Sequence, residues 1–209
     1  MGRAPRGKEA RSQASARDRI LMSAASLFAG GRIRATGVDS VIAGADVAKA
    51  TFYRHFPSKD DVVAAWLRTP DARWLDVVVG ELEGSPPLRR LVDFWGAIGR
   101  WAEEERFQGC PFLNTLGEIR DHDHPAYPLV SSYIGEVEAY LSSTALEAGI
   151  DDAPSMGRQL RFLAMGTWMA MVYEASTAPA VTARTMAVDL LVARLGTNAE
   201  DVERRVAAA

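Results

Sequence analysis

The chain has 209 residues, of which 48% are hydrophobic and 24% are charged, proportions that are ordinary for a soluble globular protein. Its single cysteine, Cys110, excludes an intramolecular disulfide and fits a reducing cytoplasm. No apolar run of a signal peptide follows the basic N-terminus, and the longest apolar uncharged stretch, Phe162 to Tyr173, is twelve residues long, too short for a bilayer. We therefore expect a cytoplasmic protein with no membrane partner.

Charge is distributed unevenly along the chain, although the formal net charge is only −3. Residues 1–68 carry 12 Lys and Arg against 6 Asp and Glu, whereas residues 69–209 carry 12 against 21. A basic first third on an acidic body indicates contact with a polyanion at one end of the molecule. Chance clustering of surface charge is the alternative.

The first predicted elements form a small N-terminal domain over residues 14–57. Residues 1–13 are rich in Gly, Pro, Arg and Ser and lack apolar periodicity, so we expect a disordered basic arm there. Helical spacing of apolar residues begins at Ser15, and glycines within residues 29–31 end that helix.

Two short helices follow, over 38–44 and 48–55, joined by a tight turn. Two short helices with an amphipathic second member have the anatomy of a helix-turn-helix, the DNA-reading unit of many regulators. We expect Phe52 and Phe56 to face the core of this three-helix domain. A corner of an ordinary helical bundle is the alternative.

A linking helix is predicted over residues 58–83. Ser58 is a suitable N-cap, with two aspartates in the first turn, and Pro57 separates it from the preceding helix. Pro70 predicts a kink or an end within it.

The remaining elements belong to a larger helical domain over residues 84–200. No segment shows sustained period-two alternation, so the prediction is an all-α chain of about nine helices. Residues 201–209 are charged and then alanine-rich, and we expect them to fray. The helices expected after the linking helix cover about 87–105, 111–120, a long segment ending near 148, 156–177 and 181–195.

The position of each polar side chain in the predicted helix-turn-helix suggests whether it contacts bases or phosphates. A recognition helix reads bases with residues near its N-terminus, where Lys49 and Thr51 lie, and holds phosphates with its flanks. Tyr53, His55 and Lys59 can donate to phosphate oxygens from those flanks.

The stretch "TGVDSVIAGADVAKATFYRHFPSKDDVVAAWL", Thr36 to Leu67, closely resembles the DNA-binding domain of the tetracycline-repressor (TetR) family of bacterial transcription regulators. The match extends back over "RILMSAASLFAGG" and so covers roughly residues 15–67. The resemblance implies a DNA-binding regulator, not an enzyme, with a second helical domain that binds a small effector and dimerises. The DNA-facing residues that it implies are Thr36, Ala48, Lys49, Ala50, Thr51, Tyr53, His55 and Lys59.

Three positions depart from the family pattern. Asp46 stands where the turn usually has Gly, at a site expected to need a positive φ. Ala48 replaces a hydroxyl residue that caps the recognition helix, at a cost of about 1 kcal/mol. Ala50 replaces a Gly, and its methyl can contact a thymine methyl. DNA binding is still expected, but the operator sequence cannot be inferred.

The segments 156–177 and 181–195 resemble the two helices that form the family's dimer interface. The first is apolar nearly all round from Phe162 to Tyr173, which is typical of a helix buried on more than one side. We expect a homodimer through these last two helices, reading a palindromic DNA operator with two recognition helices in successive major grooves. An ordinary monomeric core is the alternative.

Large apolar residues predicted to face the middle of the second domain suit a mostly apolar effector pocket, for a small molecule that releases a repressor from DNA. Plain core packing is the alternative for each of them. We take Asn114, Glu118 and Tyr133 as its polar anchors. The pocket candidates are Trp95, Ile98, Trp101, Phe112, Leu113, Asn114, Leu116, Glu118, Tyr133, Met165, Trp168 and Met169.

Two further features of the sequence suggest alternative functions. Cys110 precedes Pro111 at a helix start, which lowers a thiol pKa and suits a redox sensor, although a buried, inert cysteine is the alternative. The loop Asp121 to His124 places two histidines and two aspartates together, which suggests a metal-dependent enzyme only if another ligand joins them. Helix capping by these residues is the alternative, and no metal or cofactor is expected.

Overall fold

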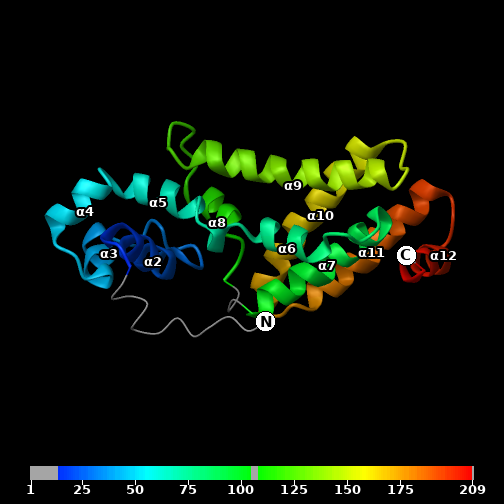
Figure 1. The fold of residues 1–209 in the computed structure, drawn as a ribbon, viewed down its shortest axis with the longest axis horizontal. Helices are drawn as coiled ribbons and strands as arrows, with labels where there is room; N and C mark the ends of the chain where they lie inside the picture. The colour runs from blue at the N-terminus through cyan, green and yellow to red at the C-terminus, as the bar shows by residue number, and fades with distance from the viewer. Residues whose placement is uncertain (1–13, 105–107, 209) are drawn as a thin grey trace.

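The computed structural model describes residues 14–104 and 108–208, and the regular structure within these ranges is entirely helical (Figure 1). This confirms an all-α fold with an N-terminal helix-turn-helix domain and a larger C-terminal helical domain. The structure has eleven α-helices in these ranges rather than about nine, because the linking segment is divided and the tail is helical. The predicted basic arm, 1–13, lies outside the described residues.

The N-terminal domain consists of α2 (Ala16–Phe28), α3 (Val38–Ala45) and α4 (Lys49–His55), at one end of the elongated molecule (Figure 1). Ser15 caps α2 by accepting a hydrogen bond from the Asp18 N–H at 3.2 Å. The buried ring of Phe28 at the other end of α2 meets Trp66 edge-on, with 5.6 Å between the ring centroids. The three helices therefore pack around one aromatic core that continues into the next helix.

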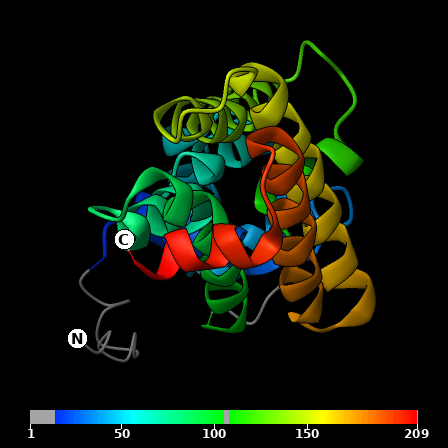
Figure 2. The ribbon, with the colours of Figure 1, turned by 90° about the vertical axis from the view of Figure 1, so that its right-hand side faces the viewer.

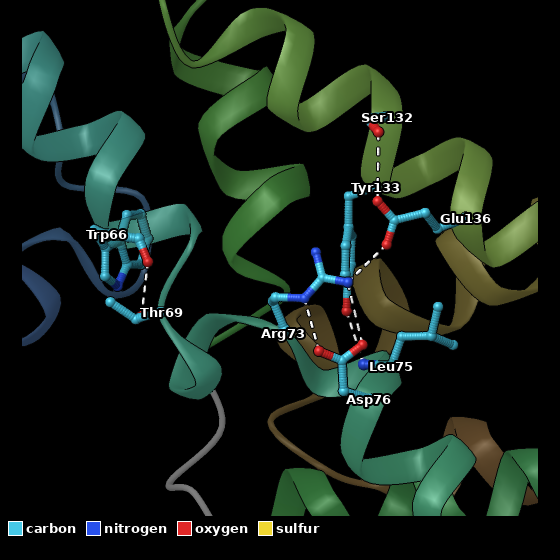
Figure 3. A network of polar contacts seen from close by, with 8 residues as sticks. All are labelled: Trp66, Thr69, Arg73, Leu75, Asp76, Ser132, Tyr133 and Glu136. Atoms are coloured by element: carbon cyan, nitrogen blue, oxygen red, sulfur yellow. Dashed lines mark hydrogen bonds and ion pairs between the residues drawn. The ribbon is translucent and has the colours of Figure 1, made fainter.

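The linking segment consists of α5 (Lys59–Leu67), a 3-10 turn η1 (Pro70–Ala72) and α6 (Trp74–Leu82). Ser58 caps α5 as predicted, since its hydroxyl accepts from the Asp61 N–H at 3.1 Å. The break predicted at Pro70 is also present, and beside it the Thr69 hydroxyl donates to the Trp66 carbonyl at 2.7 Å (Figure 3). Proline favours this break because it has no N–H to continue the helical hydrogen bonds and its ring clashes with the preceding turn.

The C-terminal domain is built from α7 (Pro87–Glu104), α8 (Pro111–Glu118), α9 (Tyr127–Glu147), α10 (Ala153–Glu174) and α11 (Ala178–Leu195). Four of these helices are long and pack side by side, while α8 is short and lies between them and the N-terminal domain (Figure 1). Trp95, Tyr133 and Trp168 are among the largest fully buried or nearly buried side chains. A single connected core therefore runs from α2 to the far end of the bundle.

The chain ends in a further helix, α12 (Ala199–Ala207), so the expectation of a frayed tail over 201–209 is wrong for its described part. Val202 and Val206, four residues apart, are buried where α12 packs against α7 and α11 (Figure 2). Outside this apolar stripe, both terminal nitrogens of Arg184 donate to the Glu203 carboxylate, at 2.7 and 2.8 Å. The two valines anchor a segment whose composition otherwise resembles a solvated end.

Candidate DNA-binding surface and effector cavity

The turn between α3 and α4 has the backbone that its sequence predicts. Asp46 adopts the left-handed conformation, with φ of 51° and ψ of 55°, which confirms the expected positive φ. Ahead of the turn, α3 approaches α2 so closely that a Cβ at Gly44 would collide with the Ser23 hydroxyl. That hydroxyl donates to the Val41 carbonyl at 3.0 Å and fixes the two helices together.

The recognition helix α4 is anchored by its aromatic residues. Phe52 and Phe56 are buried, as predicted, and the guanidinium of Arg17 lies 5.2 Å from the centroid of the Phe56 ring. Tyr53 is 45% exposed, and its ring meets Phe52 edge-on. The buried phenylalanines therefore hold α4 on its scaffold while the Tyr53 hydroxyl is left at the surface.

The N-terminal part of α4 is open to solvent. Ala48, Lys49 and Ala50 are exposed, whereas Thr51 and His55 are half-buried. The N-cap Ala48 makes no side-chain cap hydrogen bond, because the alanine side chain has no polar atom.

Two charged residues outside the predicted set belong to the same surface. Asp39, at the start of α3, lies 3.4 Å from the ammonium group of Lys49 in an exposed ion pair. Arg54 is exposed in the last turn of α4. The sequence signal for Arg54 was available, since it follows Thr51 by three residues and therefore shares its face of the helix.

Two predicted DNA contacts, Thr36 and Lys59, have internal partners. The Thr36 hydroxyl is buried and donates to the Arg32 carbonyl at 2.7 Å. The ammonium group of Lys59 donates to the carbonyls of Ile33 and Thr36, at 3.0 and 3.2 Å. Both side chains brace the turn between α2 and α3, so in this structure they position the surface. A DNA-binding role for any of the eight residues stays a prediction.

A narrow, partly open cavity lies between α6 of the linking segment and α8, α9 and α10 of the C-terminal domain. Five of the twelve pocket candidates line it, namely Phe112, Leu113, Tyr133, Met165 and Trp168. The lining residues that sequence reasoning missed are Trp74, Cys110, Ile134, Val137, Arg161 and Ala164. Among these, Trp74 is the clearest omission, because it packs directly against the predicted pocket residue Trp168, with 4.8 Å between the ring centroids.

The other seven candidates do not line this cavity, and their effector-binding role stays a prediction; they are Trp95, Ile98, Trp101, Asn114, Leu116, Glu118 and Met169. Trp95 and Ile98 are buried in the core away from the cavity. Met169 is 60% exposed on the outer face of α10. A helical stripe identifies a buried face, but it does not tell which part of that face borders empty space.

The three predicted polar anchors are already engaged by the protein's own backbone. The Asn114 amide donates to the Gln108 carbonyl at 2.9 Å, and Glu118 accepts from backbone N–H groups of the N-terminal domain. Tyr133 does line the cavity, but its phenol oxygen accepts from the Leu75 N–H at 2.7 Å (Figure 3).

A polar network surrounds Tyr133 on the linker side. The guanidinium of Arg73 lies 5.1 Å from the centroid of the Tyr133 ring and donates to Asp76 and Glu136, in each case at 2.7 Å (Figure 3). Hydrogen bonds to these two carboxylates raise the pKa of Arg73. Burial raises the pKa of Tyr133 well above its ordinary value. A phenol is neutral at pH 7 even at its ordinary pKa, and burial reinforces that state while the oxygen accepts from the Leu75 N–H.

Cys110 is buried against the cavity, and the Trp74 indole N–H donates to its sulfur at 3.2 Å. Burial raises the pKa of the Cys110 thiol, which outweighs the lowering effect of its hydrogen bonds, including those from the backbone at the start of α8. The expectation of a lowered thiol pKa is therefore wrong. The site does not favour a redox function.

The histidines of the Asp121–His124 loop serve separate contacts. His124 Nε2 lies 3.2 Å from Asp60 of α5, and its Nδ1 accepts from the Ala126 N–H at 3.0 Å. The ring of His122 stacks on Tyr127 with 4.1 Å between the centroids. Within the described ranges, no group of three or more His, Cys, Asp or Glu could hold a metal ion. These contacts do not favour the metal-dependent alternative.

An apolar stripe is exposed along α10 and α11 in the single chain, and the predicted burial of α10 on more than one side would require a partner surface that covers it. The two helices border an open groove. They are not the last pair, because α12 follows them. The most exposed residues of this stripe are Tyr173, Val181, Met169, Phe162, Met186 and Val172.

No helix of the described chain is long and apolar enough to cross a membrane.

Comparison with known proteins agrees with this architecture. The family model described as bacterial regulatory proteins, tetR family, matches residues 20–66. A TetR-family transcriptional regulator from Streptomyces coelicolor is 27% identical, with a TM-score of 0.78 over 86% of this chain and 95% of that one. A putative regulator of the same type from Streptomyces avermitilis is also 27% identical, with a TM-score of 0.70 over 85% and 98%.

More distant structures share the fold. The regulatory protein TetR from Rhodobacter sphaeroides is 16% identical, with a TM-score of 0.72 over 82% of this chain and 96% of that one. No curated protein sequence matches the chain. The structural similarity therefore extends over both domains, whereas the match to the family model is confined to the N-terminal part of the chain.

Proposed function

The chain belongs to the tetR family of bacterial regulatory proteins, and from this premise we propose that it is a dimeric repressor, released from a palindromic operator by a small, largely apolar molecule. Such a protein acts on DNA in the cytoplasm and catalyses no reaction.

The observation that carries the proposal is the recognition helix α4. Its exposed residues Lys49, Ala50 and Tyr53 lie on a helix that buried Phe52 holds in place. A short exposed helix on a rigid support is what insertion into a major groove requires. Arg54 adds a cation next to Tyr53, where phosphates flank the groove.

The exposed stripe on α10 and α11 supports a homodimer. Tyr173 is 90% exposed and Val181 is 70% exposed, which is costly for side chains of this size unless another surface covers them. Packing these two helices against the same helices of a second copy would bury the stripe. It would also present two recognition helices to DNA, about 34 Å apart on a palindromic site.

The cavity supports a small-molecule effector. Aromatic side chains and a methionine line it, and such surfaces adapt to ligands of different shape. An effector shifts the DNA affinity only in proportion to its differential affinity for the DNA-binding and released conformations. Its chemistry is therefore expected to be apolar, with few polar groups.

The experiment that tests this function is footprinting on the DNA that flanks the protein's own gene. We expect two protected half-sites related by two-fold symmetry, and release by at least one compound from an apolar ligand library. Absence of any DNA shift at low salt, where electrostatic binding is strongest, would sink the proposal.

A further inference from the structure

Helix α8 connects the cavity with the DNA-binding domain. Near its start, Phe112 and Leu113 line the cavity, and the Phe112 ring stacks on Tyr133 with 3.7 Å between the centroids. Its last residue, Glu118, reaches the turn between α2 and α3. A single short helix therefore touches both sites of the proposed function.

The contact at the end of α8 is a double hydrogen bond from one carboxylate. Glu118 Oε1 accepts from the Ile33 N–H at 2.8 Å, and Oε2 accepts from the Arg34 N–H at 2.7 Å. Both oxygens are used, the bonds are charge-assisted, and Ile33 is 2% exposed. Because the donors are consecutive backbone groups, the carboxylate fixes the orientation of the turn as well as its distance.

The turn is shaped to receive α8. Gly30 and Gly31 adopt φ of 70° and 72°, which residues with a Cβ rarely adopt. A Cβ at Gly30 would lie 3.0 Å from the side chain of Gln108, which precedes α8. The glycines therefore allow the turn to lie close to both ends of the segment that carries α8.

The turn between α2 and α3 is also bonded to the segment that follows the recognition helix. Ile33 is held on both sides, since Glu118 binds its N–H and Lys59 binds its carbonyl at 3.0 Å. Lys59 is the first residue of α5, four residues after the end of α4 at His55. A displacement of α8 would therefore act on the turn and on the segment that follows the recognition helix.

We propose that Glu118 is the positioning residue through which occupation of the cavity changes the DNA affinity. The inference rests on the proposed function, but it concerns a contact that the ligand does not touch. Phe112 and Leu113 respond to what fills the cavity, and the Glu118 carboxylate moves the α2–α3 turn with α8. Without the carboxylate, the cavity and the recognition helix are no longer coupled through this contact.

A double-mutant cycle tests the coupling without an identified effector. Ala164 lines the cavity and is buried, so Ala164→Leu places extra volume inside it. The measured quantity is the affinity for the DNA flanking the protein's own gene. We expect Ala164→Leu to change this affinity about fivefold or more in the native background, and less than about twofold when Glu118→Ala is also present, which corresponds to a typical allosteric coupling. Equal changes in both backgrounds, or no change in either, overturn the proposal.

Two controls separate coupling from damage to the fold. Glu200→Ala removes an exposed glutamate from α12, and the response to Ala164→Leu should remain. Glu118→Gln keeps the shape and one acceptor oxygen, so it should retain part of the response. Circular dichroism and thermal unfolding show whether each variant is folded. If Glu118→Ala does not fold, the comparison rests on Glu118→Gln, and a full response there overturns the proposal.

Amide hydrogen exchange gives a readout that does not need DNA. Ala164→Leu should change exchange in the peptide covering 29–36 in the native background, but not beside Glu118→Ala. If the protein bound no DNA, the proposed function would fail while this measurement still decided the coupling. Exchange in 29–36 that responds to Ala164→Leu equally with and without Glu118 overturns the inference.

Discussion

The phenol oxygen of Tyr133 accepts a hydrogen bond from the Leu75 N–H at 2.7 Å, which joins a wall of the cavity to the first turn of α6 (Figure 3). Tyr133 therefore has a structural role besides the ligand-anchoring role that the sequence suggested. Any compound that binds its hydroxyl must do so while the Leu75 N–H keeps its acceptor, or must compensate for the loss.

Tyr133→Phe should lower the free energy of unfolding by about 1–3 kcal/mol, because it leaves the buried Leu75 N–H without its acceptor. Urea denaturation followed by circular dichroism measures the change. Ser131→Ala, which removes an exposed hydroxyl from α9, is the control and should not lower stability. Equal stability of both variants would show that the Leu75 N–H finds another partner.

Tyr53→Phe should weaken operator binding with little loss of fold. The Tyr53 ring can keep its packing on Phe52, whereas the hydroxyl proposed to contact a phosphate is lost. One such hydrogen bond is worth about 1 kcal/mol, which corresponds to roughly a fivefold change in dissociation constant. Fluorescence anisotropy at fixed salt measures it. Unchanged affinity would mean that the hydroxyl does not contact DNA.

Arg54→Ala should weaken binding to operator and unrelated DNA alike, because a cation at the edge of α4 is expected to contact phosphate rather than bases. The slope of log affinity against log salt should fall by about one. Arg205→Ala, at an exposed position of α12, is the control and should leave the slope unchanged. A loss confined to one DNA sequence would instead indicate base contact.

Met169→Glu and Val181→Glu should each convert the proposed dimer into a monomer, since both residues are more than half exposed within the apolar stripe. A buried carboxylate at a subunit interface is costly, whereas at an exposed position of the monomer it is tolerated. Sedimentation equilibrium measures the mass, and DNA binding should fall with it. A dimer of unchanged affinity would place the interface elsewhere.

The Cys110 thiol should react with a thiol reagent much more slowly in the folded protein than after unfolding. Burial raises its pKa, so the reactive thiolate is scarcer at neutral pH than in the unfolded chain, and access is blocked as well. Absorbance after addition of the reagent, with and without denaturant, checks this. Equal rates would restore the redox hypothesis.

Local features of this protein followed from the amino-acid sequence alone, because neighbouring residues impose them. The backbone at Asp46, the cap at Ser58 and the break at Pro70 depend on residues within a few positions, and all three are present. The inward packing of Phe52 and Phe56 follows from helical spacing in the same way. The all-α class and the helix-turn-helix could therefore be predicted.

Only the tertiary structure decided which distant groups meet. Glu118 was expected in the pocket, but its carboxylate binds the Ile33 N–H, a partner 85 positions away. Trp74, from the linking segment, lines the cavity beside Trp168 of α10, whereas the buried stripe of α7 turns Trp95 into the core. Helical periodicity tells which face of a helix is buried, but the neighbour that covers it depends on how all helices pack together. The cavity, the linker network and the link to the recognition helix are therefore properties of the fold.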